Sequence, residues 1–129
     1  MATIFSKIIS GEIPCYKIAE NDQFLAFLDI LPVAKGHCLV IPKKEVDYYF
    51  DLDDQMMSDI HVFAKEVAKK IKKVVPCIKV GVAVVGLEVP HAHIHLIPMN
   101  SIGDLNFQKE RIKMTQEEFA QLSEEIKNA

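Results

Sequence analysis

Apolar residues recur with helical spacing in one long stretch of this chain of 129 residues. From Met56 to Val74 they return every three or four positions, which is the period of an α-helix with one buried face. Acidic residues stand at the start of this stretch and lysines near its end, and both placements complement the helix dipole. The pattern therefore predicts one long helix, which Pro76 ends.

Shorter apolar runs bounded by turn residues predict strands. The first two flank a polar turn and are expected to form a hairpin, and Pro42 closes the third because proline cannot donate to a central ladder. The fourth run is apolar enough to be buried on both faces of a sheet. The expected strands are residues 16–19, 24–28, 37–41, 79–85 and 91–97.

A second helix is expected at the C-terminal end of the chain. Thr115 and Glu118 have the spacing of a capping box, and apolar residues up to Ile126 follow at intervals of three and four. Strands with two segregated helices indicate an α+β fold and not alternating βαβ units. Because no repeat or flexible linker interrupts the pattern, residues 1–129 are expected to form a single domain.

Composition narrows the classes of function. The chain has 15 Lys+Arg against 18 Asp+Glu, a net charge of −3, so it offers no basic surface for a nucleic acid. No apolar stretch approaches the length of a membrane span, and the N-terminal residues lack the features of a secretory signal. The three cysteines are scattered and form no C-x-x-C pair, which favours a reducing compartment. We therefore expect a cytoplasmic protein without a nucleic-acid or membrane partner.

Three histidines within five residues, His91, His93 and His95, are the main candidates for chemistry. On a strand, alternate side chains share a face, so the rings would line one face about 7 Å apart while the intervening residues enter the core. Three interpretations stay open: attack on phosphorus by the middle ring, a zinc site, or a row of satisfied polar residues. Neutral imidazole has a lone pair available near neutral pH, but spacing alone does not separate the first two.

Four blocks of sequence resemble the histidine triad (HIT) superfamily, including its HINT-like and bacterial HIT branches, in order and spacing. These blocks are residues 5–14, 27–32, 36–44 and 91–98. The resemblance spans roughly residues 4–98 and implies a HIT-like fold, an antiparallel sheet of about five strands with one long helix and a C-terminal helix. It also implies a homodimer joined through the long helix and a central strand.

The same resemblance implies cleavage at the α-phosphate of a purine nucleotide substrate, without a metal or another cofactor. His93 resembles the nucleophile that forms a covalent nucleotidyl-histidine, and His91 the residue whose backbone carbonyl orients that ring. His95 resembles a phosphate contact, His37 a fourth, supporting histidine, and Asp29 the carboxylate that binds the ribose hydroxyls. The residues that resemble the apolar purine pocket are Ile4, Phe5, Ile8 and Phe27.

The sequence departs from the HINT-type pattern where the leaving group would be handled. HINT-type proteins carry an Asn on the strand before the triad and a Gly-Gln-Ser/Thr stretch leading into it. Here residues 82–85 are Val-Ala-Val-Val and residues 86–89 are Gly-Leu-Glu-Val. Glu88 thus stands where a hydroxyl is usual, and we expect it to act as a general acid or to repel phosphate.

The principal hypothesis is a nucleoside phosphoramidase or related nucleotidyl hydrolase, which acts on AMP- or GMP-type substrates through His93. Three alternatives remain open. The protein could be a dinucleoside polyphosphate hydrolase, a non-catalytic purine nucleotide-binding module, or a zinc-dependent hydrolase that uses the three histidines.

Overall fold

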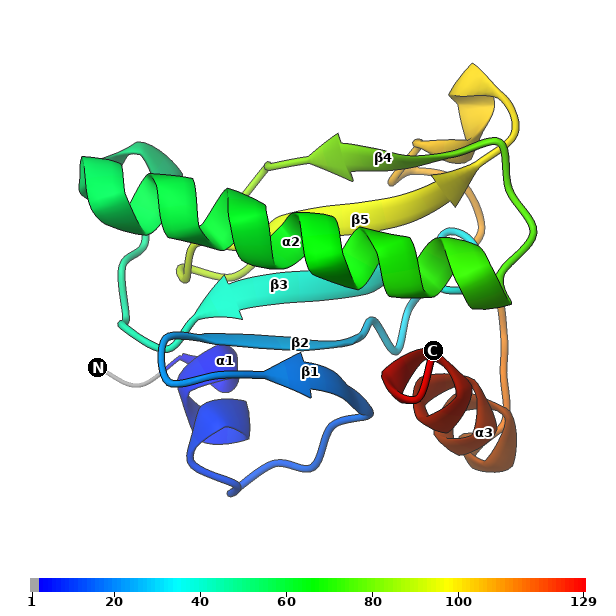
Figure 1. Ribbon diagram of the computed structural model, residues 1–129, viewed down its shortest axis with the longest axis horizontal. Helices are drawn as coiled ribbons and strands as arrows, with labels where there is room; N and C mark the ends of the chain where they lie inside the picture. Colours follow the sequence, from blue (N-terminus) through cyan, green and yellow to red (C-terminus); the bar gives the residue numbers. More distant parts are fainter. Residues whose placement is uncertain (1–2) are drawn as a thin grey trace.

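The computed structural model describes residues 3–129 and contains a five-stranded antiparallel sheet with the order β1-β2-β3-β5-β4 (Figure 1). The strands are β1 (Lys17–Glu20), β2 (Phe24–Leu28), β3 (Cys38–Pro42), β4 (Lys79–Ala83) and β5 (Ile94–Met99). The helices are α1 (Ile4–Ile9), α2 (Asp54–Val74) and α3 (Gln116–Lys127), with 3-10 turns η1 (Tyr49–Asp51) and η2 (Ile102–Asp104). The predicted α+β fold is confirmed.

The long helix α2 has the boundaries and the buried face that its sequence predicts. Asp53 caps its N-terminus by accepting a hydrogen bond from the Met56 N–H at 2.8 Å. Burial of each large aliphatic side chain contributes about 1.5–3 kcal/mol, so the apolar stripe holds the helix on the sheet. The buried residues of this stripe are Ile60, Ala64, Val67 and Ile71.

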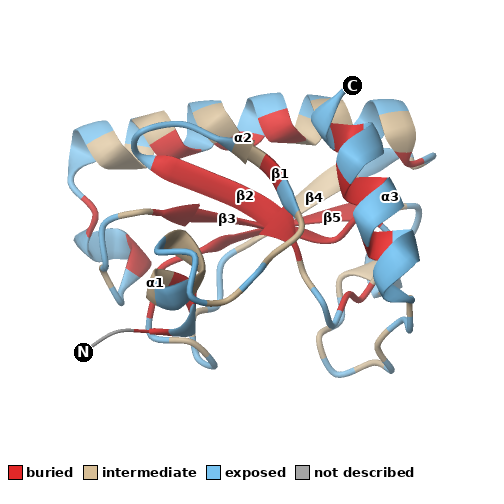
Figure 2. Cartoon of the chain, turned by 90° about the horizontal axis from the view of Figure 1, so that it is seen from below, coloured by how far each residue is buried: buried red, intermediate tan, exposed pale blue. Residues whose placement is uncertain are grey.

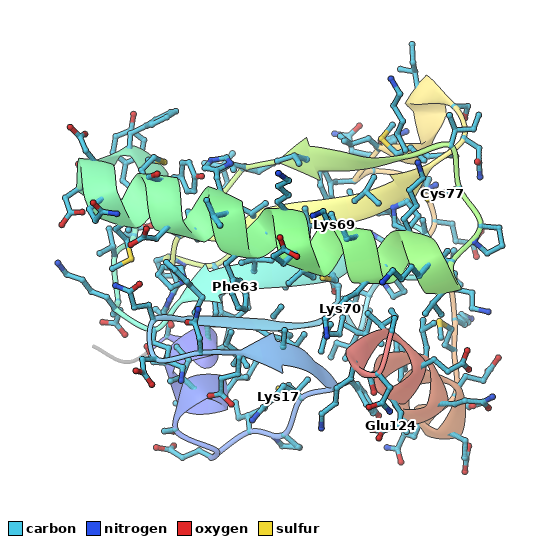
Figure 3. All side chains as sticks on the ribbon, viewed as in Figure 1. Lys17, Phe63, Lys69, Lys70, Cys77 and Glu124 are labelled. Carbon is cyan, nitrogen blue, oxygen red and sulfur yellow. The ribbon has the colours of Figure 1, made fainter. Side chains whose placement is uncertain are left out.

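The C-terminal helix α3 also follows its sequence signal and packs against α2 and β1. Thr115 and Glu118 form the capping box that the sequence predicts. Where the two helices meet, the Lys70 ammonium of α2 donates to the Lys127 carbonyl at 3.0 Å (Figure 3). In residues 3–129, no helix combines the length and the apolar character that a membrane span requires.

The sheet separates two hydrophobic cores (Figure 2). The main core lies under α2 and α3 and includes Ala92, Ile94 and Leu96, which confirms that the residues between the triad histidines enter the core. The opposite face carries α1. Its smaller core is formed by Phe5, Leu25, Phe27, Leu39 and Ile41.

The run at residues 79–85 forms an edge strand and not a buried one. The strand ends at Ala83 and pairs only with β5. Val82 is 55% exposed and Val85 is 49% exposed. The prediction of burial on both faces is wrong for the single chain, because within residues 3–129 no strand pairs with the outer edge of β4.

The strand that carries the triad begins later than predicted, so only His95 lies within β5. Residues 91–93 precede it in irregular backbone because β4 does not extend far enough to pair with them. Instead, the Ala92 N–H donates to the Val46 carbonyl, 2.6 Å away, in the segment before η1. Two of the three triad histidines therefore lie in a loop and one lies in the strand.

Helix α1 was not predicted from the apolar pattern. Its six residues are too few to show a helical period. Thr3 caps it by accepting a hydrogen bond from the Ser6 N–H at 3.0 Å. This helix places Phe5 against the small core on the face that carries the histidines.

Gly36 directly precedes His37, and its replacement tests how closely the side chains pack at the start of β3. It has φ +91°, and an added Cβ would lie 2.9 Å from Val75 Cγ2 and 3.2 Å from Pro98 Cγ. Gly86 has φ +73° but would meet nothing within 4 Å, so it is a matched control. We expect Gly86→Ala to lower the free energy of unfolding by roughly 1–2 kcal/mol, the backbone cost alone. Gly36→Ala should lower it further in urea titrations, and equal losses would contradict this packing.

Candidate active site

Four histidines from two strand ends gather on the face of the sheet that carries α1. All are buried: His37 is 1% exposed, and the triad residues His91, His93 and His95 are 0%, 5% and 9% exposed. The ring centroids of His93 and His95 lie 4.9 Å apart, and those of His37 and His95 lie 5.2 Å apart. The rings lean toward one another and are closer than the predicted spacing of about 7 Å along an ideal strand.

The His93 ring is held in one tautomer by its own backbone. Its Nδ1 lies 2.7 Å from the His91 carbonyl oxygen. A carbonyl can only accept, so Nδ1 carries the proton and Nε2 carries the lone pair. Burial lowers the pKa of His93 below its ordinary 6.5, which outweighs the opposite effects of the carbonyl and of Glu88. At neutral pH this ring therefore presents a neutral nitrogen base at Nε2.

His37 and His95 form a second chain with the opposite polarity. The Val33 N–H donates to His37 Nδ1 at 3.1 Å, so the His37 proton must lie on Nε2. That Nε2–H donates to His95 Nδ1 at 3.0 Å, which leaves His95 with an N–H at Nε2. Burial lowers the pKa of His37 to about 3 and that of His95 to about 4. His95 thus offers a neutral hydrogen-bond donor.

His91 fastens the triad to α1 and β3. Its Nε2 donates to the Pro42 carbonyl at 2.8 Å, and its Nδ1 lies 3.0 Å from the Thr3 hydroxyl. Thr3 also caps α1, so one side chain joins the helix to the triad. Phe5 then packs edge-on against His91 and His93, with ring centroids 5.7 Å and 5.0 Å away. The placement of α1 and that of the His93 ring depend on the same contacts.

Asp29 follows β2 and lies beside the His37–His95 pair. Its Oδ1 accepts from the Leu31 N–H at 2.9 Å, and its Oδ2 is 3.5 Å from His37 Nε2. Burial raises the pKa of Asp29, while the Leu31 hydrogen bond and the Arg111 charge oppose that rise. The fold therefore brings this carboxyl to the histidines from a distant part of the sequence. Its role toward a ribose stays a prediction.

The residues predicted to form a purine pocket divide into two groups. Phe5 and Phe27 are buried in edge-to-face contact, with ring centroids 5.8 Å apart, and Ile8 packs beside them. Ile4, in contrast, is 51% exposed and is not part of this apolar cluster. The structure brings three of the four side chains together.

Glu88 lies exposed in the connection between β4 and β5. Its negative charge acts on His93 and on Asp29 and raises the pKa of each. The residue is therefore near enough to influence the site electrostatically. Whether it acts as an acid or repels phosphate stays a prediction.

The donors spaced to hold a metal ion are not the three triad rings. Within residues 3–129, the one such group is Asp29, His37 and His95, whose ligand atoms lie within 4.8 Å of one another. Asp29 lies far from the triad in the sequence and joins this group through the fold. His37 does not fit a ligand role here, because its Nδ1 lone pair accepts from Val33 and its Nε2 carries the proton.

Two further residues at the site had no sequence signal. Phe107 packs on His95 and His37, with ring centroids 4.6 Å and 6.1 Å away. The Arg111 guanidinium lies 5.8 Å from the centre of the Phe107 ring. Both belong to the irregular segment between η2 and α3, where no period or motif indicates which face a side chain occupies.

Comparison with known proteins gives a consistent family. The HIT domain family matches residues 10–102. An uncharacterized HIT-like protein of Borreliella burgdorferi is 34% identical, covering 95% of this chain and 94% of its own length. The adenosine 5'-monophosphoramidase of Schizosaccharomyces pombe is 38% identical, covering 98% and 96%. The crystal structure of a HIT-like protein of Bartonella henselae superposes with a TM-score of 0.83 at 30% identity, covering 98% and 95%.

The neutral state of His37 makes folding depend on pH. Its pKa is about 3 in the folded protein and near the ordinary 6.5 when unfolded, so between these values the unfolded chain binds the extra proton. Stability from this residue is present above pH 6.5 and is lost as the pH falls toward 3. We expect His37→Asn to flatten the fall in the free energy of unfolding between pH 7 and pH 4, measured by urea titration. Parallel curves for the two proteins would contradict it.

Proposed function

The chain belongs to the HIT domain family, and from this we propose that it is a nucleoside phosphoramidase or related nucleotidyl hydrolase. It cleaves at the α-phosphate of a purine nucleotide substrate. The observation that carries the proposal is the His93 ring, whose Nδ1–H is bound to the His91 carbonyl and whose Nε2 bears the lone pair. Relatives named as adenosine 5'-monophosphoramidases support a nucleotide hydrolase at the level of the family.

The reaction proceeds in two displacements at phosphorus. His93 Nε2 attacks the α-phosphorus, and the bond from phosphorus to the leaving amine breaks as that amine takes a proton from water. The His91 carbonyl stabilises the positive charge that develops on the ring through the Nδ1–H bond. Water then attacks the phosphorus, its bond to Nε2 breaks, and the nucleoside monophosphate is released. The proton that this water loses neutralises the hydroxide left by the first step. The net change is the addition of one water across the P–N bond.

The other residues bind and orient the nucleotide. Phe5 and Phe27 supply apolar surface for the purine, and the Asp29 carboxyl accepts hydrogen bonds from the ribose hydroxyls. His95 donates its Nε2–H to a phosphoryl oxygen, where negative charge grows in the transition state. One ring thus attacks while its neighbour donates, because their backbone and side-chain partners fix opposite tautomers.

The role of His93 is tested by its replacement. We expect His93→Ala to lower the rate of AMP release from adenosine 5'-phosphoramidate by about 10³-fold or more, because the nucleophile is lost. AMP binding, measured by calorimetry, should stay within a few fold, since Phe27 and Asp29 remain. Asp22→Ala, which changes an exposed residue in the turn between β1 and β2, is the control and should keep full activity.

The outcomes of this assay separate the candidate functions. Hydrolysis that persists in His93→Ala would refute the nucleophile. A wild-type protein that binds AMP yet releases no product from adenylated amines or dinucleoside polyphosphates would be a nucleotide-binding module.

The same proposal includes a homodimer formed through β4 and α2. An unpaired strand edge is a template for pairing with another chain. Apolar side chains are exposed along this side of the molecule, and a cleft of about 700 Å³ lies at the end of β4 with His93 in its wall. A partner seated there would adjoin the reacting site. The exposed residues are Tyr48, Phe50, Val62, Val82, Val84, Val85 and Leu87.

A charge on the β4 edge tests this interface. We expect Val82→Lys to convert a dimer into a monomer at micromolar concentration, because it buries an unpaired ammonium between two edges. Ile30→Lys is the control, since Ile30 is 65% exposed but follows β2, which β3 and β5 separate from β4. Light scattering coupled to size exclusion measures the mass. A monomeric wild type, or a dimeric Val82→Lys variant, would contradict the interface.

A further inference from the structure

The segment between η2 and α3 is tied back onto the loop that follows β2. The Arg111 guanidinium donates to the Leu31 carbonyl at 2.6 Å and to the Phe107 carbonyl at 3.0 Å. The next residue, Ile112, donates its N–H to the Pro32 carbonyl at 2.9 Å. Three hydrogen bonds therefore fix a positive charge beside the loop that carries Asp29.

Phe107 connects this charge to the histidines. Its ring contacts His95 at a centroid distance of 4.6 Å, and the Arg111 guanidinium lies 5.8 Å from the same ring. Aromatic and cation–π contacts of this kind are favourable beyond the apolar area that they bury, so they stabilise the position of the segment against the histidines. The segment between η2 and α3 therefore packs against the histidines in a defined position and forms one side of the site.

The histidines of the site supply no countercharge for a phosphate. Burial keeps the rings of His37, His93 and His95 neutral at neutral pH. Two further ionisable groups near these rings, Asp29 and Glu88, are carboxyl groups and supply only negative charge. A phosphoryl group that enters this environment loses solvation and meets two carboxyls.

Arg111 is the cation whose charge reaches several groups of the site. It lowers the pKa of Asp29, of His37 and of His95, so its charge reaches the side of the site where His95 would donate to a phosphoryl oxygen. Among the groups of the site, the charge of Lys109 lowers the pKa of His37 alone.

On this geometry we infer that Arg111 is a further substrate-binding residue, which supplies the countercharge for the phosphate of the bound nucleotide. The inference rests on the proposed function, because it assumes that the site takes a nucleotide. Arg111 lies beyond residue 102, where the match to the HIT domain family ends. Two of its N–H groups bind carbonyls, and a guanidinium has five, so three remain for phosphoryl oxygens or water.

The test compares two ligands that differ only in the phosphate. Binding of AMP and of adenosine is measured by calorimetry for wild type, Arg111→Gln and Arg111→Lys. We expect Arg111→Gln to weaken AMP binding by about 10-fold or more, the usual loss for a hydrogen bond to a charged group, and to leave adenosine binding unchanged. Arg111→Lys, which keeps a charge without the planar fork, should fall between the two.

Lys113→Gln is the matched control, since Lys113 is an exposed cation two residues further along the same segment. This variant should leave the binding affinities for AMP and for adenosine unchanged. The wild-type protein gives a second readout that needs no variant: its preference for AMP over adenosine should decline as salt rises.

Three results would overturn the inference. Equal weakening of AMP and adenosine by Arg111→Gln would mean that Arg111 only holds the segment in place. Unchanged binding of both ligands, or a preference for AMP that salt does not alter, would remove the countercharge role while the proposed function stands. A wild type that binds neither ligand would overturn the proposed function, and this inference with it.

Discussion

The hydrogen bond from His93 Nδ1 to the His91 carbonyl is the interaction on which the site depends. It determines which nitrogen of His93 carries the proton and therefore which nitrogen can act as a base. The bond exists because residues 91–93 are not yet part of β5. In a regular strand the His91 carbonyl would serve the sheet ladder, whereas here the Ala92 N–H binds the Val46 carbonyl and the segment bends. The late start of β5 is thus a condition for the proposed chemistry.

A second constraint is that the site keeps its imidazoles neutral. Burial disfavours the charged form of each ring, and backbone groups at the two ends decide the tautomers. The Val33 N–H determines the tautomer of His37 and, through that ring, the tautomer of His95. The His91 carbonyl determines the tautomer of His93. The result is an acceptor nitrogen beside a donor nitrogen on rings 4.9 Å apart. Neutral rings cannot balance a phosphate charge, so the proposed nucleotide site needs a cation from outside the histidine cluster.

Much of this arrangement can be predicted from the sequence, and the features that cannot be predicted have identifiable physical reasons. The period of α2, the capping box of α3 and the alternation of Ala92, Ile94 and Leu96 are local signals, and the structure obeys them. Helix α1 was not predicted because six residues are too few for a helical period to show. The exposure of β4 was not predicted because an apolar run does not reveal whether a neighbouring strand exists. The roles of Thr3, Phe107 and Arg111 were not predicted because their contacts join segments that are distant in the sequence.

The most direct measurement of the central claim is the tautomer of each histidine, read from ¹⁵N chemical shifts of the imidazole nitrogens at neutral pH. The geometry predicts that His93 is neutral with its proton on Nδ1, and that His37 and His95 are neutral with their protons on Nε2. A proton on Nε2 of His93, or a positively charged His93 ring at that pH, would contradict the account.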